Sequence, residues 1–218
     1  EALQGATLLP LQIDSTNADA IEAGVRAYAG KPIINSVNGK QEVLDAVLPI
    51  AAHYGCNVIG LTLDEDGIPA TASERVAIAR RIIDEAARYG IGRERILIDC
   101  LVMTASTNQA QVTEILRAVT LCRQELGVHC TLGVSNVSFG LPARELLNAT
   151  FLTAAFGAGL DAPIMNPGSQ RYMDAVHSYR VLNAEDLGSV RFIERYAGWN
   201  DPYKVPVNVA STPAASSS

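Results

Sequence analysis

The sequence predicts an α/β fold of the (β/α)8 TIM-type barrel class, with six of the eight strand–helix units recognisable. Short apolar runs alternate with helical patterns along the 218 residues, as in parallel sheets whose strands are covered on both faces. Asp or Asn closes every one of these runs, as expected where strand ends converge on one mouth. No glycine-rich phosphate fingerprint follows the first run, which disfavours an open dinucleotide-binding sheet.

The strands are predicted from short runs of Ile, Leu and Val. The six strands are expected, in chain order, at residues 8–14, 32–35, 58–63, 96–99, the start of 130–141, and 160–166. The fifth run, CTLGVSNVSFGL, breaks after its strand into small polar residues and a glycine. Such a strand end places an amide side chain, Asn136, at the rim of the sheet, where it can donate and accept hydrogen bonds at once.

The helices are predicted from terminal signals as well as from apolar spacing. Residues 15–17 are candidate caps for a helix that runs to Ala29 and stops at Gly30. Thr71 and Glu74 have the spacing of a capping box at the start of a long helix over 71–89. Further helices are expected at residues 41–54, 108–126, 142–156, 169–182 and 184–197.

Composition restricts the partners. A net charge of −6 and a pI of about 5.1 disfavour nucleic acid and anionic membranes, and no apolar run is long enough to cross a bilayer. The four cysteines form no CxxC pair and lie in apolar contexts. We therefore expect reduced thiols, rather than disulfides or a metal site, in a cytoplasmic protein.

Polar residues close the predicted strands: Asp14, Asn35, Asp64, Asp99, Asn136 and Asn166. Three carboxylates and three amides with few cations nearby suit a ligand rich in N–H donors. A carboxylate-only Mg²⁺ site is a weaker alternative, and none of the three histidines follows a strand end, so no metal is predicted. A third interpretation is that each residue only caps the next helix or holds its loop.

The motifs LQIDSTN, PIINSVNG, ILIDCLV and GVSNVSFGLP resemble the pterin-binding barrel of the methyltetrahydrofolate:corrinoid methyltransferases. That family includes the folate module of cobalamin-dependent methionine synthase, and the resemblance covers about residues 10–198. It implies that Asp14, Asn35 and Asp99 hydrogen-bond the pterin ring, and that Asn136 lies near the nitrogen that carries the methyl group. The predicted pterin site comprises Asp14, Asn35, Asp99, Ser135, Asn136 and Asn166.

The resemblance implies transfer of a methyl group between 5-methyltetrahydrofolate and the cobalt of a corrinoid, such as cobalamin, held by a partner protein or domain. Asn136 would be the catalytic residue, stabilising the pterin nitrogen as it gains proton character. This activity belongs to one-carbon metabolism and methionine biosynthesis. A homodimer is compatible with the sequence.

The chain also departs from the family that it resembles. The family begins with two further strand–helix units, so we expect a partial barrel over residues 1–204, followed by a Pro-, Ala- and Ser-rich linker or disordered tail over 205–218. A non-catalytic or incomplete folate-binding fragment is one alternative function. A dihydropteroate synthase-like enzyme is less favoured, because that family needs a Lys on the strand where this chain has Gly133–Ser138 and an Arg after the last strand.

Overall fold

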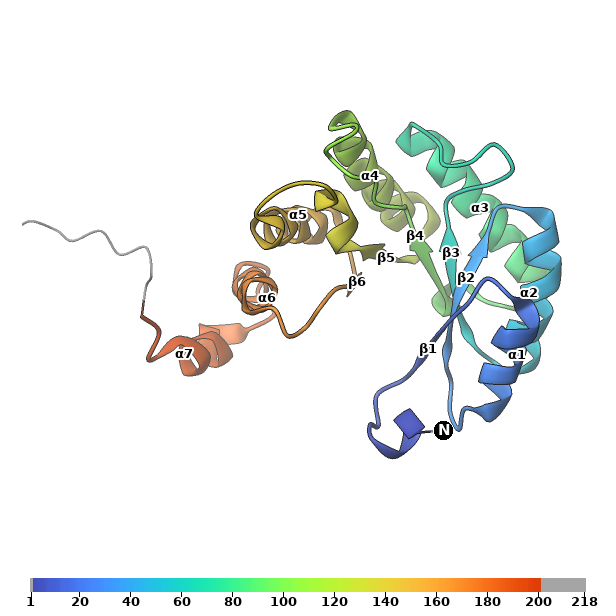
Figure 1. The fold of residues 1–218 in the computed structure, drawn as a ribbon, viewed down its shortest axis with the longest axis horizontal. Coiled ribbons are helices and arrows are strands. Elements are labelled where there is room, and N and C mark those ends of the chain that lie inside the picture. Colours follow the sequence, from blue (N-terminus) through green and yellow to red (C-terminus); the bar gives the residue numbers. More distant parts are fainter. Residues whose placement is uncertain (1, 201–218) are drawn as a thin grey trace, which may run out of the picture. The chain divides into compact units, whose positions relative to one another are not determined.

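The computed structural model describes residues 2–200, and the chain divides into two compact units, Glu1–Tyr179 and Arg180–Ser218. The first unit contains a parallel six-stranded sheet in which the strands are neighbours in chain order (Figure 1). The strands are β1 (Gln12–Asp14), β2 (Ile33–Asn38), β3 (Asn57–Leu61), β4 (Ile96–Asp99), β5 (His129–Gly133) and β6 (Ala162–Ile164). This curled half-barrel confirms the predicted α/β class and is consistent with part of a TIM-type barrel.

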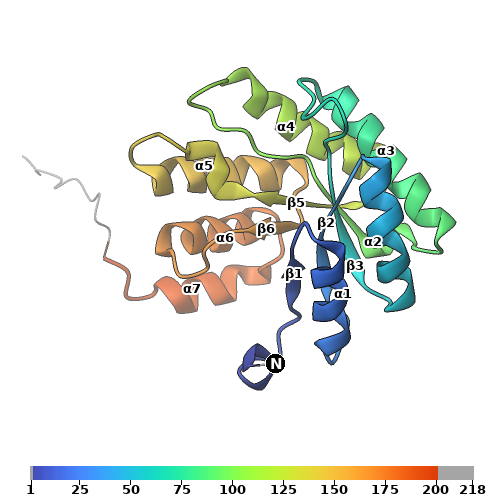
Figure 2. The same ribbon diagram turned by 45° about the vertical axis from the view of Figure 1, so that its right-hand side comes forward.

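A helix follows each strand of the first unit (Figure 2). The helices are α1 (Ala18–Ala27), α2 (Gln41–His53), α3 (Ala72–Arg88), α4 (Ala110–Leu121), α5 (Arg144–Ala158) and α6 (Gln170–Leu182). Helices α1 to α5 pack side by side in chain order, as βαβ crossovers require. None of the helices in residues 2–200 combines the length and the apolar character that a bilayer crossing needs.

Both of the predicted N-terminal helix signals are confirmed. The side chain of Asn17 accepts a hydrogen bond from the Ala20 N–H at 3.0 Å and caps α1. Thr71 and Glu74 form the reciprocal bonds of a capping box at the start of α3. These side chains satisfy N–H groups that have no partner inside the helix.

Several predicted elements are shorter than expected, among them the last strand, which was expected at residues 160–166 and is formed by Ala162–Ile164. Only Gln12–Asp14 of the first apolar run forms a strand, and Leu8 and Leu9 before it are exposed; Pro10 has no N–H with which to join a ladder. In the second unit, the helix predicted from residue 184 begins at Val190 instead, as α7 (Val190–Tyr196). The predicted tail over 205–218 lies outside the described residues.

The alternation of side chains along the strands decides which residues face away from the helices. Ile13 packs against Gly24 of α1, where an added Cβ would lie 3.0 Å from Ile13 Cγ2. The neighbouring Asp14 therefore points to the concave face of the half-barrel. Likewise, Cys130 Sγ donates to the Val119 carbonyl of α4 at 3.8 Å, which places the next residue, Thr131, on the concave face.

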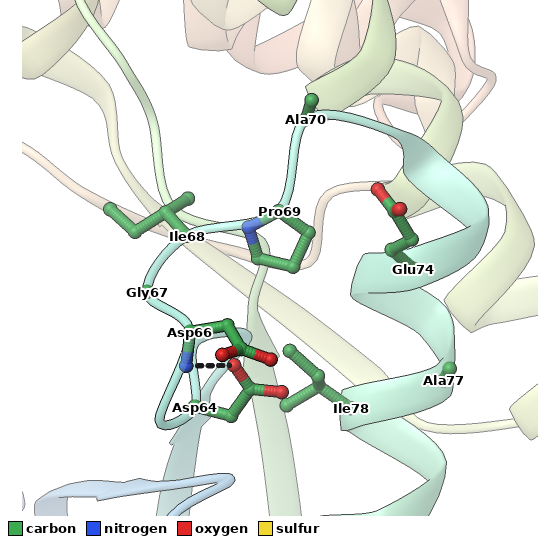
Figure 3. Close-up of a pocket in the computed structure, with 9 residues that line it drawn as sticks. All are labelled: Asp64, Asp66, Gly67, Ile68, Pro69, Ala70, Glu74, Ala77 and Ile78. Atoms are coloured by element: carbon green, nitrogen blue, oxygen red, sulfur yellow. Dashed lines mark hydrogen bonds between the residues drawn. The ribbon is translucent and has the colours of Figure 1, made fainter.

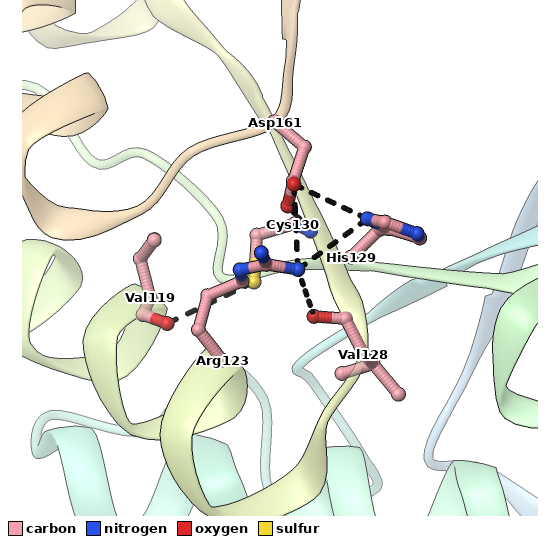
Figure 4. Close-up of polar contacts among 6 residues, drawn as sticks. All are labelled: Val119, Arg123, Val128, His129, Cys130 and Asp161. Carbon is pink, nitrogen blue, oxygen red and sulfur yellow. Dashed lines mark hydrogen bonds and ion pairs between the residues drawn. The ribbon is translucent and has the colours of Figure 1, made fainter. Parts of the chain in front are cut away.

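An ion-pair network joins the N-terminal ends of β5 and β6 (Figure 4). Asp161 Oδ1 lies 3.1 Å from His129 Nδ1 and 3.3 Å from Arg123 Nη1. Its other oxygen, Oδ2, accepts the Cys130 N–H at 2.8 Å, and Arg123 Nη1 also donates to the Val128 carbonyl at 3.2 Å. Asp161 thus fixes the start of the three-residue strand β6 against β5, at the end of the sheet opposite the candidate site.

All four cysteines are free and fully buried in the first unit: Cys56, Cys100, Cys122 and Cys130. Cys100, Cys122 and Cys130 lie near one another, after β4, at the end of α4 and on β5, and the interactions of Cys100 with the other two thiols together with burial raise its pKa. Burial also raises the pKa of Cys56. The thiols therefore belong to the apolar core between sheet and helices.

The turn after β2 depends on a close approach of two backbones at Gly39. Its N–H donates to the Leu63 carbonyl at 2.7 Å. An added Cβ would lie 2.9 Å from that same oxygen and 2.8 Å from Ile78 Cγ2. The backbone oxygen cannot move aside as a flexible side chain would.

We therefore expect Gly39→Ala to lower the free energy of unfolding by about 1–3 kcal/mol, as overpacking does. Gly157→Ala in α5 is the matched control, because nothing lies within 4 Å of its added Cβ and alanine favours a helix by about 0.5–1 kcal/mol over glycine. Urea denaturation measures both. Equal stability of the Gly39 variant and the parent would contradict the prediction.

Candidate functional site

The residues of the predicted pterin site all lie at the carboxyl edge of the sheet. Asp14 and Asp99 are the last residues of β1 and β4, and Asn35 lies inside β2. Ser135 and Asn136 lie in the turn that follows β5, η4 (Val134–Ser138), and Asn166 comes two residues after β6. In parallel α/β folds this edge is where ligands bind.

Asp14 and Asn35 are the two site residues that contact each other directly among those that the structure describes. They are register partners on β1 and β2, and Asn35 Nδ2 donates to Asp14 Oδ2 at 3.5 Å. This bond is at the long limit for a hydrogen bond. Asp14 is also exposed and Asn35 half-buried. Each side chain can therefore give up this mutual contact and hydrogen-bond a ligand instead.

Asp99 is the buried carboxylate of the site, with 8% of its surface exposed. Its register partner on β5 is Thr131, which lies on the concave face. Burial raises the pKa of Asp99 to about 6, against the opposing effects of the Leu101 N–H, which donates to Oδ1 at 2.8 Å, and of the Arg75 charge. A carboxylate held in this way is a strong acceptor for N–H donors once it is ionised.

Asn136 is exposed at the rim and held close to the end of β5. An added Cβ at Gly133 would lie 3.0 Å from Asn136 Nδ2, so a side chain at that position would push the amide slightly aside. The first residue of α5, Arg144, fastens the same turn. Its Nε donates to Ser138 Oγ at 3.0 Å and its Nη2 to the Ser135 carbonyl at 2.9 Å.

The loop after β4 supports the Asn136 turn from the other side. Thr104 and Ser106 donate their hydroxyls to the Phe139 carbonyl at 2.7 and 3.1 Å. The Ala105 N–H donates to the Val137 carbonyl at 2.9 Å. The turn that carries Asn136 is therefore held by hydrogen bonds from two neighbouring segments, as a preorganised site requires.

Asn166 makes a local contact. Its Oδ1 accepts the Gly168 N–H at 2.9 Å, which is the geometry of an Asx turn. This bond accounts for Asn166 as a loop residue, and its contact with a ligand stays a prediction. The side chain of Asp64 is used similarly, since its Oδ1 accepts the backbone N–H of Asp66 at 3.0 Å.

A pocket of about 390 Å³ lies beside this acidic loop, between residues 64–70 and the first turns of α3 (Figure 3). The residues that line it are Asp64, Asp66, Gly67, Ile68, Pro69, Ala70, Glu74, Ala77 and Ile78. None of these belongs to the predicted pterin site. The Asp64 carboxylate already accepts a loop N–H, and the Glu74 carboxylate accepts the N–H and the hydroxyl of Thr71 at the helix cap.

Sequence reasoning missed the residues that hold Asp99 in place. Thr62 Oγ1 donates to the Asp99 carbonyl at 3.3 Å, and the guanidinium of Arg75 bonds the carbonyls of the next two residues. A signal for Arg75 was present: it shares a helical face with Ala72 and Ala79, which are buried. A charged residue at a core-facing position of an amphipathic helix calls for a partner.

A family model described as pterin binding enzyme matches residues 1–166 of this chain. The chain belongs to the pterin-binding enzyme family. The match includes all six strands and the residues of the predicted site, Asn166 being its last residue.

Curated relatives of this pterin-binding enzyme are named methyltransferase or methionine synthase. A methylcorrinoid:tetrahydrofolate methyltransferase from Eubacterium limosum is 32% identical over 201 residues, which are 90% of this chain and 72% of that protein. A methionine synthase from Mycobacterium leprae (strain TN) is 35% identical over 177 residues, 75% of this chain and 15% of that protein. A methionine synthase from Mycobacterium tuberculosis is 34% identical over 89% of this chain and 17% of its own length.

Solved structures with the same fold include dihydropteroate synthases. The enzyme from Yersinia pestis superposes with a TM-score of 0.69 over 84% of this chain and 76% of that chain, at 17% identity. The enzyme from Vibrio fischeri ES114 has a TM-score of 0.69 and 19% identity over 84% of this chain and 71% of that one. At this level of identity the likeness shows the shared fold alone.

Proposed function

We propose that this pterin-binding enzyme moves a methyl group between 5-methyltetrahydrofolate and the cobalt of a corrinoid. The observation that carries the proposal is one sheet edge with a buried carboxylate, a polar Asp–Asn pair and an exposed Asn on a braced turn. The name and extent of the Eubacterium limosum relative support it. The chain spans less than a fifth of the methionine synthases that it matches, so homocysteine as a final acceptor is not part of the proposal.

The pterin ring offers an aminopyrimidinone edge with several N–H donors, which complements acceptors on the concave face. Asp99 accepts two such donors best when it is ionised. Asp14 and Asn35 then exchange their mutual 3.5 Å contact for bonds to the ligand. Asn35 can donate to a ring carbonyl or nitrogen while Asp14 accepts. Ser135 and Asn166 complete this proposed site at the rim.

Asn136 acts at the reacting nitrogen in this proposal. The pterin nitrogen is a poor leaving group for a methyl unless it gains positive character, and an amide oxygen held nearby stabilises that charge. Asn136 itself does not give up a proton. The brace from Arg144 and the loop after β4 keeps the amide in place without reorganisation when the charge develops.

The corrinoid is held by a partner protein or domain and supplies the cobalt that gives or accepts the methyl group. A large, flat partner group could lie on Phe139, which follows Asn136 in the same turn and is 69% exposed. An aromatic ring at the mouth offers apolar surface without adding charge. The chain's own part is then to bind and orient the folate.

We also propose that two further strand–helix units complete the barrel, of which this chain forms a part. Within the described residues, β1 pairs with β2 alone and β6 with β5 alone. Two unpaired edges of a curled parallel sheet favour closure by more strands. A folate-binding fragment without transfer activity is the second candidate, and these same edges favour it.

Isothermal titration with 5-methyltetrahydrofolate, followed by single-turnover methyl transfer to reduced cobalamin, tests the proposal. Binding and transfer together are the expected result. Binding without transfer would instead indicate the fragment. Condensation of p-aminobenzoate with a pterin pyrophosphate would indicate a dihydropteroate synthase, and no binding of any pterin would refute a folate function.

A further inference from the structure

Among residues 2–200, one guanidinium is fully buried, that of Arg75 on α3, with 0% of its surface exposed. Its direct partners are neutral. Nη1 donates to the carbonyls of Cys100 and Leu101, the latter at 3.0 Å, and Nη2 donates to Gln111 Oε1 at 2.7 Å. Nε has no hydrogen-bond partner within the described residues. A buried charge with only neutral contacts is costly and calls for an explanation.

The turn after β4, whose carbonyls the guanidinium binds, explains this burial. Asp99 ends β4, and its Oδ1 accepts the N–H of Leu101 at 2.8 Å. Arg75 holds the carbonyl of that same Leu101, a non-glycine residue whose φ is +59°. A left-handed residue of this kind persists only where its surroundings fix it. Arg75 and Asp99 thus hold the two sides of one peptide segment.

The charges around Asp99 come from few elements. From α3, Arg75 favours the ionised carboxylate. From α4, Glu114 acts on Arg75 and accepts the Ala72 N–H at 2.6 Å. The neighbouring strands present neutral hydroxyls instead, from Thr62 on the β3 side and Thr131 on β5, and the next residue in the chain, Cys100, is buried.

We infer that Arg75 is a positioning residue for the pterin site, fixing the turn after β4 and supplying the positive field that keeps Asp99 charged. The inference rests on the proposed function insofar as Asp99 binds the pterin. A direct ion pair between Arg75 and Asp99 would neutralise the carboxylate and occupy its oxygens. Because Arg75 binds backbone carbonyls instead, the Asp99 carboxylate stays available to the ligand's N–H donors.

The test is the pH dependence of 5-methyltetrahydrofolate binding in parent and variants. In the parent, affinity should fall as the pH drops through about 6, where Asp99 takes up a proton. Arg75→Met and Arg75→Gln remove the positive charge, so this midpoint should rise by about one pH unit or more. Arg75→Gln keeps one donor for the turn carbonyls and serves if the Met variant fails to fold.

Arg75→Lys retains the charge. A midpoint near that of the parent, together with a raised midpoint in a neutral variant, supports the inference, whereas a raised midpoint in the Lys variant or an unchanged one in a neutral variant overturns it. Arg80→Met is the matched control, because Arg80 lies on the same helix, half exposed and paired with Glu125 at 3.7 Å. Its midpoint should equal the parent's.

A second readout needs no folate. The ¹³C carboxyl resonance of Asp99, assigned through Asp99→Asn, titrates in the ligand-free protein, and its midpoint should move upward in the neutral Arg75 variants. An unmoved resonance would refute the coupling even if folate binds well. Failure of the parent to bind folate at any pH would refute the proposed function and leave this titration as an independent test of Arg75.

Discussion

Asn136→Ala should slow methyl transfer at saturating 5-methyltetrahydrofolate by about a hundredfold or more, the size of effect seen when one preorganised hydrogen-bonding group is removed. The reacting nitrogen carries little positive charge in the substrate and more in the transition state. An interaction that strengthens only then acts on the rate rather than on affinity. Folate affinity should fall much less, by about 1–2 kcal/mol for one lost hydrogen bond.

Single-turnover transfer to reduced cobalamin, with folate saturating, is the measurement. Asn183→Ala, which removes an exposed amide from the second unit, is a matched control and should transfer at the parent rate. If Asn136→Ala keeps the parent rate at saturation, Asn136 only shapes the turn. A parallel loss of folding and of binding would lead to the same conclusion.

Asp99→Asn should produce two opposite effects, weaker folate binding and a more stable fold. The amide replaces a charged acceptor by a group that also donates, and binding should weaken by about 2–4 kcal/mol. The fold should gain stability at pH 7, because the variant no longer buries an ionised carboxylate. An amide oxygen can still accept the Leu101 N–H that Asp99 accepts at 2.8 Å.

The sign of the stability effect follows from the direction of the pKa shift. The folded protein holds the Asp99 proton up to about pH 6, whereas an unfolded Asp releases it near 3.8. Folded protein therefore binds more protons between these values, and its stability falls as the pH rises from about 4 to about 6. The loss is on the order of 3 kcal/mol above that range.

Denaturant titration at pH 4.5 and pH 7.5 measures this difference. Asp99→Asn should be more stable than the parent at pH 7.5 by about 1–3 kcal/mol, and the advantage should shrink at pH 4.5. Asp84→Asn on α3, whose side chain is exposed, should show no such dependence. A destabilised Asp99→Asn variant at pH 7.5 would show that the carboxylate supports the fold instead.

Regular elements were predicted well because local signals determine them. The six strands, the Asn17 cap and the Thr71–Glu74 box were readable in the sequence, since apolar runs and helix starts depend on neighbouring residues. The first strand was overextended, because Leu8 and Leu9 are as apolar as strand residues yet lie exposed before Pro10.

The sequence predicted where the candidate site residues lie at the sheet edge, but not the contacts that hold them there; their binding of a pterin stays a prediction. Strand ends converge in any parallel half-barrel, so Asp14, Asn35 and Asp99 could be placed at one edge from the pattern alone. The contacts that fix them join segments far apart in the chain, such as Arg75 with Leu101 or Thr104 with Phe139. No local pattern encodes such pairs, and only helical spacing pointed to Arg75.

The four buried thiols can be used to detect local opening of the core. With no exposed surface on Cys56, Cys100, Cys122 or Cys130, a thiol reagent can react only with molecules in which the sheet and helices have parted. Labelling rates in native buffer then measure the frequency of such openings. Cys56, which lies apart from the three-thiol cluster, reports on the β2–β3 side of the sheet, and the cluster reports on β4 and β5. Faster labelling at one than at the other would reveal which half of the sheet opens first.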